Sequence, residues 1–367
     1  MSFFSVFEQY QTMDIENVIG HMNQQAVLRR LNKNTLSIDD FAALISPSAL
    51  PFLEQIAQKS HDITRRNFGN TIHLFTPMYL SNYCNNRCLY CGFNHDTQIK
   101  RYQMSLDEID NEAKVIASTG LKHILILTGD APKKASISYL KSCCDVLKRY
   151  FSSISIEIYA LDKKGYENLI QSGVDGLTIY QETYNTDLYD KLHPAGPKKN
   201  FQFRMDAPQC AAEAGMRAIT IGTLLGLDNW RKDIFFTALH ASWLENHYPE
   251  TEISIALPRI RPYYGCYQPE HRVTDQDMVQ MMIAIRLFLP RCGITISTRE
   301  NESFRNNILK LGVTKISAGS STAVGGHSLS SVQHNQFEIS DTRSVEQMVT
   351  FLETNNIQPV FKDWERF

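Results

Sequence analysis

Short apolar runs alternate with helix-length amphipathic segments from Thr71 onward, and this alternation restricts the possible fold more than any other feature of the sequence. We expect eight of these runs to be β-strands, at residues 72–80, 124–127, 154–159, 177–180, 218–221, 253–257, 294–297 and 315–318. Strands that alternate regularly with helices form a parallel sheet, and eight of them close into a (β/α)8 barrel of the TIM type. The sequence therefore predicts an α/β barrel, with a six-stranded open barrel as the alternative.

The residues on either side of this pattern are expected to be additions to the barrel. Residues 1–70 contain helical patterns and no convincing strand, and Ser37 and Asp40 have the spacing of a capping box. We therefore predict an N-terminal helical extension at 1–70, the barrel at 71–332, and a C-terminal segment at 333–367. In that last segment we expect a helix over 344–355 and a tail packed on the barrel.

The composition excludes several classes of protein. Of the 367 residues, 43% are hydrophobic and 21% are charged, and 37 Lys and Arg against 39 Asp and Glu give a net charge of -2. A charge so evenly balanced gives no long-range attraction for a polyanion. Since no apolar run approaches the roughly 20 residues of a membrane span, we expect a cytoplasmic protein that binds neither nucleic acid nor a membrane.

Three of the eight cysteines, Cys84, Cys88 and Cys91, lie within eight residues of one another. They follow the first predicted strand, which places them in a loop at the C-terminal mouth of the barrel, where such folds have their active sites. Three thiolates leave one iron of a [4Fe–4S] cluster without a protein ligand and open to another molecule. A zinc site is the alternative, with His95 as the local candidate for a fourth ligand.

The Cys-x3-Cys-x2-Cys spacing, with Tyr90 before the last cysteine, resembles the signature of the radical S-adenosylmethionine (SAM) superfamily. The resemblance implies two cofactors, a [4Fe–4S] cluster and SAM, and it implies that SAM chelates the open iron and is cleaved to a 5′-deoxyadenosyl radical. Such a radical requires an enclosed pocket without water, and the mouth of a barrel can provide one.

Residues at other strand ends resemble the SAM-binding positions of that superfamily. Besides Tyr90, the residues concerned are Thr128, Gly129, Asp130, Glu157, Arg204 and Gly222. The first three resemble the Gly-Gly-Glu motif that binds the SAM amino group, with departures at its first and third positions. Glu157 and Arg204 resemble residues that meet the ribose or the carboxylate, and Gly222 begins a segment that resembles the one passing the adenine. Each has a structural alternative, such as a tight turn for a glycine or a hydrogen-bonded carboxylate for Glu157.

Longer stretches resemble one branch of the superfamily. Residues 180–185 and 257–262 resemble the tyrosine-cleaving enzymes, which are the 2-iminoacetate synthases of thiamine biosynthesis and the maturase of [FeFe]-hydrogenase. Further resemblance to the 2-iminoacetate synthases, for example at 66–71 and 297–300, covers nearly the whole chain. The maturase holds a second cluster through additional C-terminal cysteines, whereas no cysteine follows Cys292 here. We therefore expect a member of the 2-iminoacetate synthase family.

This resemblance implies cleavage of the Cα–Cβ bond of L-tyrosine to 2-iminoacetate (dehydroglycine) and p-cresol. The site must then hold the carboxylate of the amino acid, a task for cations and hydroxyls at strand ends. The candidates are Arg299, Ser317, Glu182, Gln181 and Arg259, with Arg299 and Ser317 placed best for the carboxylate. Arg299 could instead form an ion pair between strands inside the barrel. Arg259 and Arg261 could instead neutralise a buried acid.

The resemblance also implies partners, namely a thiazole synthase that consumes the product and a reductant such as flavodoxin or ferredoxin. Two other functions stay open. One keeps the cluster and the barrel but acts on another substrate, such as a different aromatic amino acid. The other is an electron carrier with a structural cluster, which the open fourth iron does not favour because a carrier gains nothing from a missing ligand.

Overall fold

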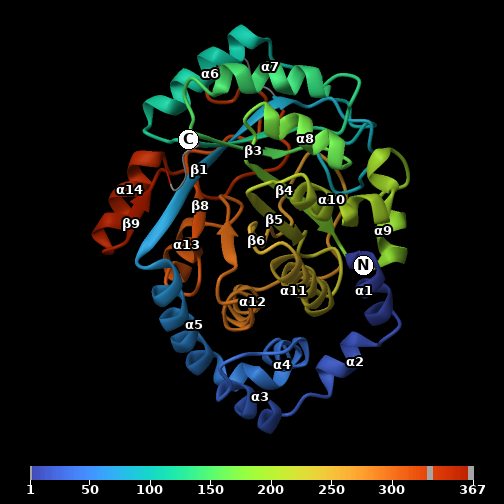
Figure 1. Cartoon of the computed structure of the whole chain (residues 1–367), viewed down its shortest axis with the longest axis vertical. Helices are drawn as coiled ribbons and strands as arrows, with labels where there is room; N and C mark the ends of the chain where they lie inside the picture. The colour runs from blue at the N-terminus through green and yellow to red at the C-terminus, as the bar shows by residue number, and fades with distance from the viewer. Residues whose placement is uncertain (1, 329–333, 363–367) are drawn as a thin grey trace.

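The computed structural model describes residues 2–328 and 334–362, and its centre is a closed barrel of parallel strands surrounded by helices (Figure 1). The barrel strands are β1 (Thr71–Ser81), β2 (His123–Thr128), β3 (Ser153–Glu157), β4 (Gly176–Glu182), β5 (Ala218–Thr223), β6 (Glu252–Ala256), β7 (Gly293–Ile296) and β8 (Lys315–Ser317). Each pairs in parallel with the next, and β1 pairs with both β2 and β8, which closes the barrel. The predicted (β/α)8 fold is confirmed, and the six-stranded alternative is wrong.

The strands lie where the apolar runs predicted them, with ends that differ by no more than two residues. Side chains alternate between the two faces of a strand, and the outward positions are mostly isoleucine, as at Ile154, Ile156, Ile219 and Ile221. These side chains are buried in the main hydrophobic core. The apolar runs of the sequence therefore consist largely of residues buried between the barrel and the helices. This is why they predicted the strand positions well.

The helices that follow the strands cover the outside of the barrel. They are α6 (Leu106–Ser118), α7 (Ile137–Leu147), α8 (Lys163–Gln171), α9 (Thr186–Leu192), α10 (Phe201–Glu213), α11 (Trp230–His247), α12 (Asp275–Phe288) and α13 (Glu302–Ile308), with a short 3-10 turn, η2 (Pro197–Lys199), before α10. Capping boxes begin α6 at Ser105 and α12 at Thr274. Among the residues that the structure describes, no helix is long and apolar enough to cross a membrane.

The N-terminal residues form five helices and one 3-10 turn that pack along α10, α11 and α12 (Figure 1). They are α1 (Phe3–Gln11), α2 (Ile15–Gly20), α3 (Gln24–Leu31), α4 (Ile38–Leu44), η1 (Pro47–Phe52) and α5 (Leu53–Phe68). Phe3 stacks on His240 of α11 with ring centroids 3.8 Å apart, and Ser37 and Asp40 form the expected capping box. This part is helical as predicted, and its division from the barrel at residue 70 stays a prediction.

The C-terminal segment contains α14 (Val345–Thr354), close to the helix expected at 344–355, and an additional strand, β9 (Gln358–Val360). This strand pairs in parallel with the start of β1 and lies outside the barrel. The sequence pattern does not predict this strand, because a run of three residues that includes Pro359 has no strand periodicity. Its pairing depends instead on the unusual length of β1. The predicted boundary at residue 332 and the last five residues lie outside the described residues.

A buried ion pair attaches the segment before α14 to the barrel. Arg305 of α13 pairs with Asp341, and both side chains are almost completely buried. Arg305 also donates to the backbone oxygen of Ser317 in β8, and Arg343 donates a further hydrogen bond to Asp341. Removal of one partner from such a group leaves an uncompensated buried charge.

We expect Asp341→Ala to lower the free energy of unfolding by about 3–5 kcal/mol, because Arg305 then lacks its counterion. Urea unfolding followed by circular dichroism measures this loss. The control is Asp62→Ala, which removes an exposed carboxylate from α5 and should change stability by less than about 0.5 kcal/mol. Equal stabilities of the two variants would contradict a role for the pair in attaching this segment.

Candidate active site

The three clustered cysteines line one cavity at the C-terminal mouth of the barrel. The loop that carries them follows β1 and is held by backbone hydrogen bonds from Asn85 to Asp130, 2.9 Å, and from Arg87 to Ala195, 3.0 Å. Leu89 donates in the same way to Leu192, 3.1 Å. The loop is thus fixed between the segment after β2 and the end of α9, and its three cysteines line the same cavity.

Eleven of the fifteen candidate residues line this cavity. They are Cys84, Cys88, Tyr90, Cys91, Thr128, Gly129, Asp130, Glu157, Glu182, Arg204 and Arg299. Because they come from the ends of five different strands, the loops after them and, for Arg204, the first turn of α10, only the closed barrel brings them together. The four candidates that do not line the cavity are Gln181, Gly222, Arg259 and Ser317.

The segment after β2 fits closely against the cysteine loop. A Cβ atom at Gly129 would lie 2.4 Å from the backbone oxygen of Tyr83 and 3.0 Å from Cβ of Cys84, so a larger residue would displace the loop. Asp130 accepts a hydrogen bond from Nδ2 of Asn86, 2.6 Å. Thr128 Oγ1 is buried and has no hydrogen-bond partner among the described residues, although it lies at the cavity. This hydroxyl is therefore available to a ligand.

Tyr90 lies between the cysteines and α9. Its hydroxyl is 2.6 Å from Nε2 of His193, and the other ring nitrogen of His193 is 2.7 Å from the backbone oxygen of Tyr189. Burial lowers the pKa of His193 to about 3, so the ring is neutral. The neutral ring fixes the side chain of Tyr90 in the wall of the cavity.

A buried charge network forms the floor of the cavity at the end of β4. Glu182 pairs with Lys198 and, at 3.7 Å, with Arg204, whose Nε donates to the backbone oxygen of Tyr180. Burial by itself raises the pKa of Glu182, but the charges of Lys198 and Arg204 outweigh it and hold this pKa below its usual value. Glu182 has a φ of 72°, and the pairing of β4 with β5 shifts register beside it. Positive φ is uncommon outside glycine. In this conformation the carboxylate of Glu182 contacts the two cations.

Glu157 lies at the end of β3, and its pKa is shifted in the opposite direction from that of Glu182. Burial raises the pKa of Glu157 to about 7, and the charge of Arg299 opposes this shift without cancelling it. Two carboxylates in one cavity therefore differ in charge near neutral pH. Such a difference is frequent in active sites, where one group must hold a proton that the other does not.

Arg299 and Arg261 present two guanidinium groups to the cavity. The Cζ atom of Arg299 lies 3.4 Å from the ring centroid of Phe337, and Arg261 Nη2 is 3.1 Å from Oε2 of Glu300. Arg261 Nε is buried and has no hydrogen-bond partner in the described part of the chain. An arginine fork with a free donor suits the binding of a carboxylate.

The four remaining candidates have other contacts. Arg259 binds Glu300 through two nitrogens and Asp275 through a third, 2.7 Å, so its donors are directed away from the cavity. Ser317 Oγ accepts the backbone N–H of Thr298, 3.0 Å, and the amide of Gln181 donates to Phe201, 3.4 Å. Their roles in substrate binding stay predictions that these contacts do not favour.

Gly222 allows two strands to approach closely. A Cβ atom there would lie 2.3 Å from the backbone oxygen of Ala256. Its predicted role beside the adenine is not tested by this contact. Leu224, two residues later in the segment that resembles the one passing the adenine, does line the cavity.

Several residues of the cavity wall are not among the candidates that the sequence predicts. Gln336 and Phe337 come from the segment after the barrel, and the backbone of Gln336 bonds to Thr322, 3.1 Å. A Cβ atom at Gly92 would lie 2.4 Å from the backbone oxygen of Gln336, so this segment rests directly on the cysteine loop. No sequence pattern predicts this contact between the C-terminal segment and the cysteine loop. Arg261 had a signal, since it lies in the resembling stretch 257–262, but it could not be separated from Arg259.

The cavity fits a [4Fe–4S] cluster with a bound polar ligand. Three free thiols face it, and the buried donors Thr128 Oγ1 and Arg261 Nε lack partners among the described residues. Burial raises the pKa of Cys84 to about 12, so a cationic metal group is needed to deprotonate it for ligation. His95, which a zinc site would require, is exposed and does not line the cavity.

Comparisons with known proteins agree with this site. Residues 78–236 match the radical SAM superfamily, and residues 256–358 match the Biotin and Thiamin Synthesis associated domain. The chain is 36% identical to the 2-iminoacetate synthase of Salmonella typhimurium, over 99% of this chain and 97% of that protein. For the enzyme of the same name from Escherichia coli, the identity is also 36%, over 100% of this chain and 97% of that protein.

This chain belongs to the 2-iminoacetate synthase family of radical SAM enzymes. The solved structure of the FeFe-hydrogenase maturase HydG from Carboxydothermus hydrogenoformans is also similar, with a TM-score of 0.85 and 27% identity over 98% of this chain and 83% of that one. Radical SAM enzymes use a [4Fe–4S] cluster and SAM, so the cofactor prediction is confirmed and the zinc alternative is wrong.

Gln336 is placed to adjust the redox potential of such a cluster. Tyr79 donates to its Oε1, 2.7 Å, and its Nε2 is 3.6 Å from Sγ of Cys91. A hydrogen bond to a ligating sulfur stabilises the reduced cluster, in which the sulfur carries more negative charge.

We therefore expect Gln336→Leu to lower the midpoint potential of the cluster. A hydrogen bond of about 0.5–1.5 kcal/mol corresponds to a decrease of about 20–65 mV for one electron. Redox titration followed by electron paramagnetic resonance measures the potential. Tyr79→Phe should produce a smaller decrease, because it only releases the amide, and Gln58→Leu on the exposed face of α5 should produce none. An unchanged potential in Gln336→Leu would show that the amide does not act on the cluster.

Proposed function

We propose that this chain is a tyrosine lyase that cleaves the Cα–Cβ bond of L-tyrosine to 2-iminoacetate and p-cresol, and that 2-iminoacetate then provides part of the thiazole of thiamine. SAM is consumed to 5′-deoxyadenosine and methionine. The observation that carries the proposal is similarity to 2-iminoacetate synthases along the full chain. It is supported by a cavity that combines three thiols with two arginines.

In this proposal Cys84, Cys88 and Cys91 hold the cluster. When bound, the cluster and SAM supply a 5′-deoxyadenosyl radical that removes a hydrogen atom from the substrate. Thr128 Oγ1 and the backbone around Gly129 would receive the amino group of SAM. Tyr90, Asp130, Glu157, Arg204 and Gly222 complete the proposed SAM-binding set, in which Glu157 would accept hydrogen bonds from the ribose once it is ionised. Because the pKa of Glu157 is about 7, this contact strengthens as the pH rises through neutrality.

Arg299 and Arg261 are the proposed holders of the tyrosine carboxylate. Both line the cavity, and the unpartnered Nε of Arg261 supports its inclusion. Two fixed guanidinium groups would orient the amino acid so that its nitrogen lies near the reactive carbon of the adenosyl group. Glu182, kept anionic by Lys198 and Arg204, would provide a fixed negative charge on the opposite wall.

Apolar and aromatic side chains would exclude water from this chemistry. Phe93, Leu224, Ile260 and Phe337 line the same cavity as the charged groups. An enclosed site protects a radical from solvent and strengthens each charge interaction inside it.

The partners are also part of the proposal. A one-electron donor such as flavodoxin or ferredoxin would supply two electrons per turnover. One is used for SAM cleavage, and the second, with a proton, converts the aromatic fragment left after hydrogen removal and bond cleavage into p-cresol. A thiazole synthase would take up the labile imine. We place the enzyme in the cytoplasm, where both kinds of partner are expected.

The test is anaerobic incubation of the reconstituted protein with SAM, dithionite and single amino acids, followed by product analysis. Tyrosine should give p-cresol, glyoxylate from hydrolysis of the imine, and 5′-deoxyadenosine, whereas phenylalanine and tryptophan should not give the corresponding products. The protein should contain about four irons per chain, the stoichiometry of one cluster. Zinc without sulfide, or turnover of another amino acid without p-cresol, would overturn the proposal.

Arg299→Ala should weaken tyrosine binding by roughly tenfold to over a hundredfold, the usual cost of losing a hydrogen bond to a charged group. Half-saturating tyrosine concentrations, measured through p-cresol formation, give this change. SAM cleavage without tyrosine and the iron content should persist. Arg272→Ala, an exposed arginine in the connection from β6 to α12, is the control and should behave as the parent. If Arg299→Ala matches the parent instead, Arg261 becomes the principal carboxylate ligand.

A further inference from the structure

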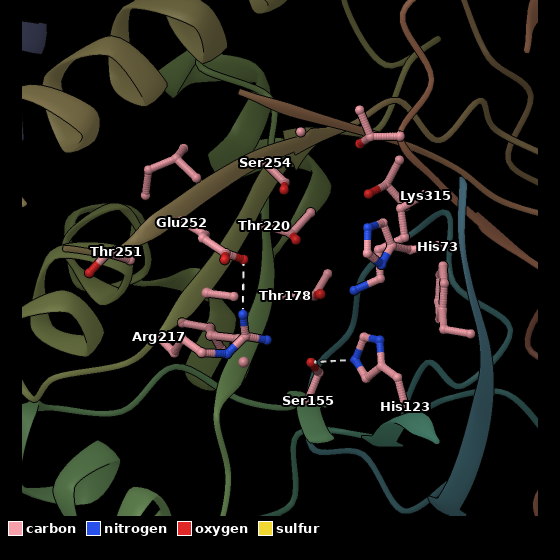
Figure 2. A pocket seen from close by; sticks show the side chains of 18 of the residues that line it. His73, His123, Ser155, Thr178, Arg217, Thr220, Thr251, Glu252, Ser254 and Lys315 are labelled. Atoms are coloured by element: carbon pink, nitrogen blue, oxygen red, sulfur yellow. Dashed lines mark hydrogen bonds and ion pairs between the residues drawn. The ribbon is translucent and has the colours of Figure 1, made fainter. Parts of the chain in front are cut away.

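The inside of the barrel contains two chambers whose charges differ. Figure 2 shows the lower chamber, which has a volume of about 430 Å³ and lies where the strands begin. Its described lining carries equal numbers of basic and acidic side chains, namely Arg217, Arg291 and Lys315 against Glu245, Glu250 and Glu252. The described lining of the cysteine cavity carries more basic than acidic side chains, namely Lys198, Arg204, Arg261 and Arg299 against Asp130, Glu157 and Glu182. A surplus of positive charge is therefore found in the cysteine cavity.

Arg299 differs from the other basic residues of this cavity in its contacts. The other three each contact a glutamate. In the part of the chain that the structure describes, no carboxylate is within ion-pair distance of Arg299, whose Nη1 is 3.4 Å from the backbone oxygen of Arg259. A long side chain with so little support has to be fixed when a ligand binds, and the cost of fixing it lowers the affinity.

Phe337 provides a contact that fixes this side chain in advance. The Cζ atom of Arg299 lies 3.4 Å from the centroid of the Phe337 ring. This is a face-to-face distance, because an edge-on guanidinium group would bring a nitrogen closer to the ring than van der Waals contact allows. A ring that covers the face of the guanidinium group leaves the N–H donors in its plane free, whereas a carboxylate partner would occupy them.

The position of Phe337 is itself fixed by hydrogen bonds on both sides. Its backbone oxygen accepts from Oγ1 of Thr322, 2.8 Å, and the backbone N–H of Glu338 donates to the oxygen of Pro262, 2.9 Å. The segment therefore bridges the loops that follow β8 and β6. The ring is thus a fixed surface against which the guanidinium group of Arg299 can rest.

The contact also preserves the charge of Arg299. Burial lowers the pKa of Arg261, the charge of Glu300 opposes this shift, and the positive charges of Arg259 and Arg299 add to it. The two guanidinium groups of the cavity therefore repel each other. The electron-rich face of an aromatic ring stabilises a cation without neutralising it. Phe337 can thus hold Arg299 beside Arg261 and leave its charge available to an anionic ligand.

We propose that Phe337 is a positioning residue, whose ring holds the guanidinium group of Arg299 in the orientation that binds the carboxylate of tyrosine. This inference rests on the proposed function, in which Arg299 binds that carboxylate. The preceding residue, Gln336, contacts Sγ of Cys91 at 3.6 Å. One short segment thus contacts both a proposed cluster ligand and the arginine that orients the substrate.

The test measures p-cresol formation by the reconstituted, cluster-loaded protein at several tyrosine concentrations. Phe337→Leu removes the ring but keeps an apolar side chain. The half-saturating tyrosine concentration should rise about 2- to 12-fold, the usual cost of fixing a long side chain on binding. The value of kcat should stay near that of the parent, because Arg299 has the same position once the substrate is bound. Phe337→Tyr keeps the aromatic face and should behave as the parent.

Phe351→Leu is the matched control. It removes the ring of another arginine contact in the C-terminal segment, in which Cζ of Arg343 lies 5.1 Å from the centroid of Phe351. Phe351 is half-buried in α14 and does not line the cavity. This variant should leave the half-saturating tyrosine concentration unchanged. Iron content and SAM cleavage without tyrosine should match the parent in every variant, which separates positioning from a general loosening of the segment.

A double-mutant cycle separates positioning from direct contact between Phe337 and the substrate. If the ring acts through Arg299, Phe337→Leu should cause no further loss of kcat/KM for tyrosine in protein that already carries Arg299→Ala. A ring that contacts the substrate directly would cause the same loss in both backgrounds.

Four results would overturn the proposal. They are a parent-like half-saturating tyrosine concentration in Phe337→Leu, equal losses in the two backgrounds, a Phe337→Tyr variant as weak as Phe337→Leu, and a loss of iron or of SAM cleavage in Phe337→Leu. If the parent itself makes no p-cresol, the proposed function fails together with this inference. If the parent makes p-cresol and any of the four results is found, only the role of Phe337 is overturned.

Discussion

Closure of the parallel barrel is the constraint on which the rest of the structure depends. When β1 pairs with both β2 and β8, all eight strands end around one opening. Residues that are far apart in the sequence, such as Cys84, Glu182 and Arg299, then line a single cavity. The isoleucine layer under the helices stabilises the closed barrel. Residues at the strand ends are therefore not needed for packing and can be polar.

Within that frame, buried charges fix the positions of the functional groups. Glu182 is held by Lys198 and Arg204, while Glu300 neutralises Arg259 and contacts Arg261. Each of these acids would be costly to bury alone, and each is paired with two cations. The surplus positive charge is what a cavity for amino acid carboxylates requires. Arg259 and Arg261 share Glu300, but Arg259 also binds Asp275, and only Arg261 lines the cavity.

The sequence was sufficient to predict the barrel, because short apolar runs that alternate with helix-length segments are typical of a parallel sheet. The spacing of Cys84, Cys88 and Cys91 also selects three residues that the structure brings to one cavity, and their role as cluster ligands stays a prediction. The sequence failed for Gln336 and Phe337, whose position depends on how the C-terminal segment crosses the mouth. The roles of Ser317 and Gln181 stay predictions, because the place of a residue at a strand end does not tell which groups its side chain contacts. Local patterns predict elements, whereas long-range contacts decide the lining of a site.

The two faces of the strands show how the barrel combines stability with function. Outward positions are apolar and buried, as at Ile219 and Ile221, whereas inward positions of the same strand are small or polar, as at Thr220 and Gly222. A barrel filled with branched side chains would be better packed, but it would have neither the cysteine cavity nor the chamber below it. Because the isoleucine layer lies outside the strands, the inside of the barrel can contain two cavities, with Tyr180 in the lining of both.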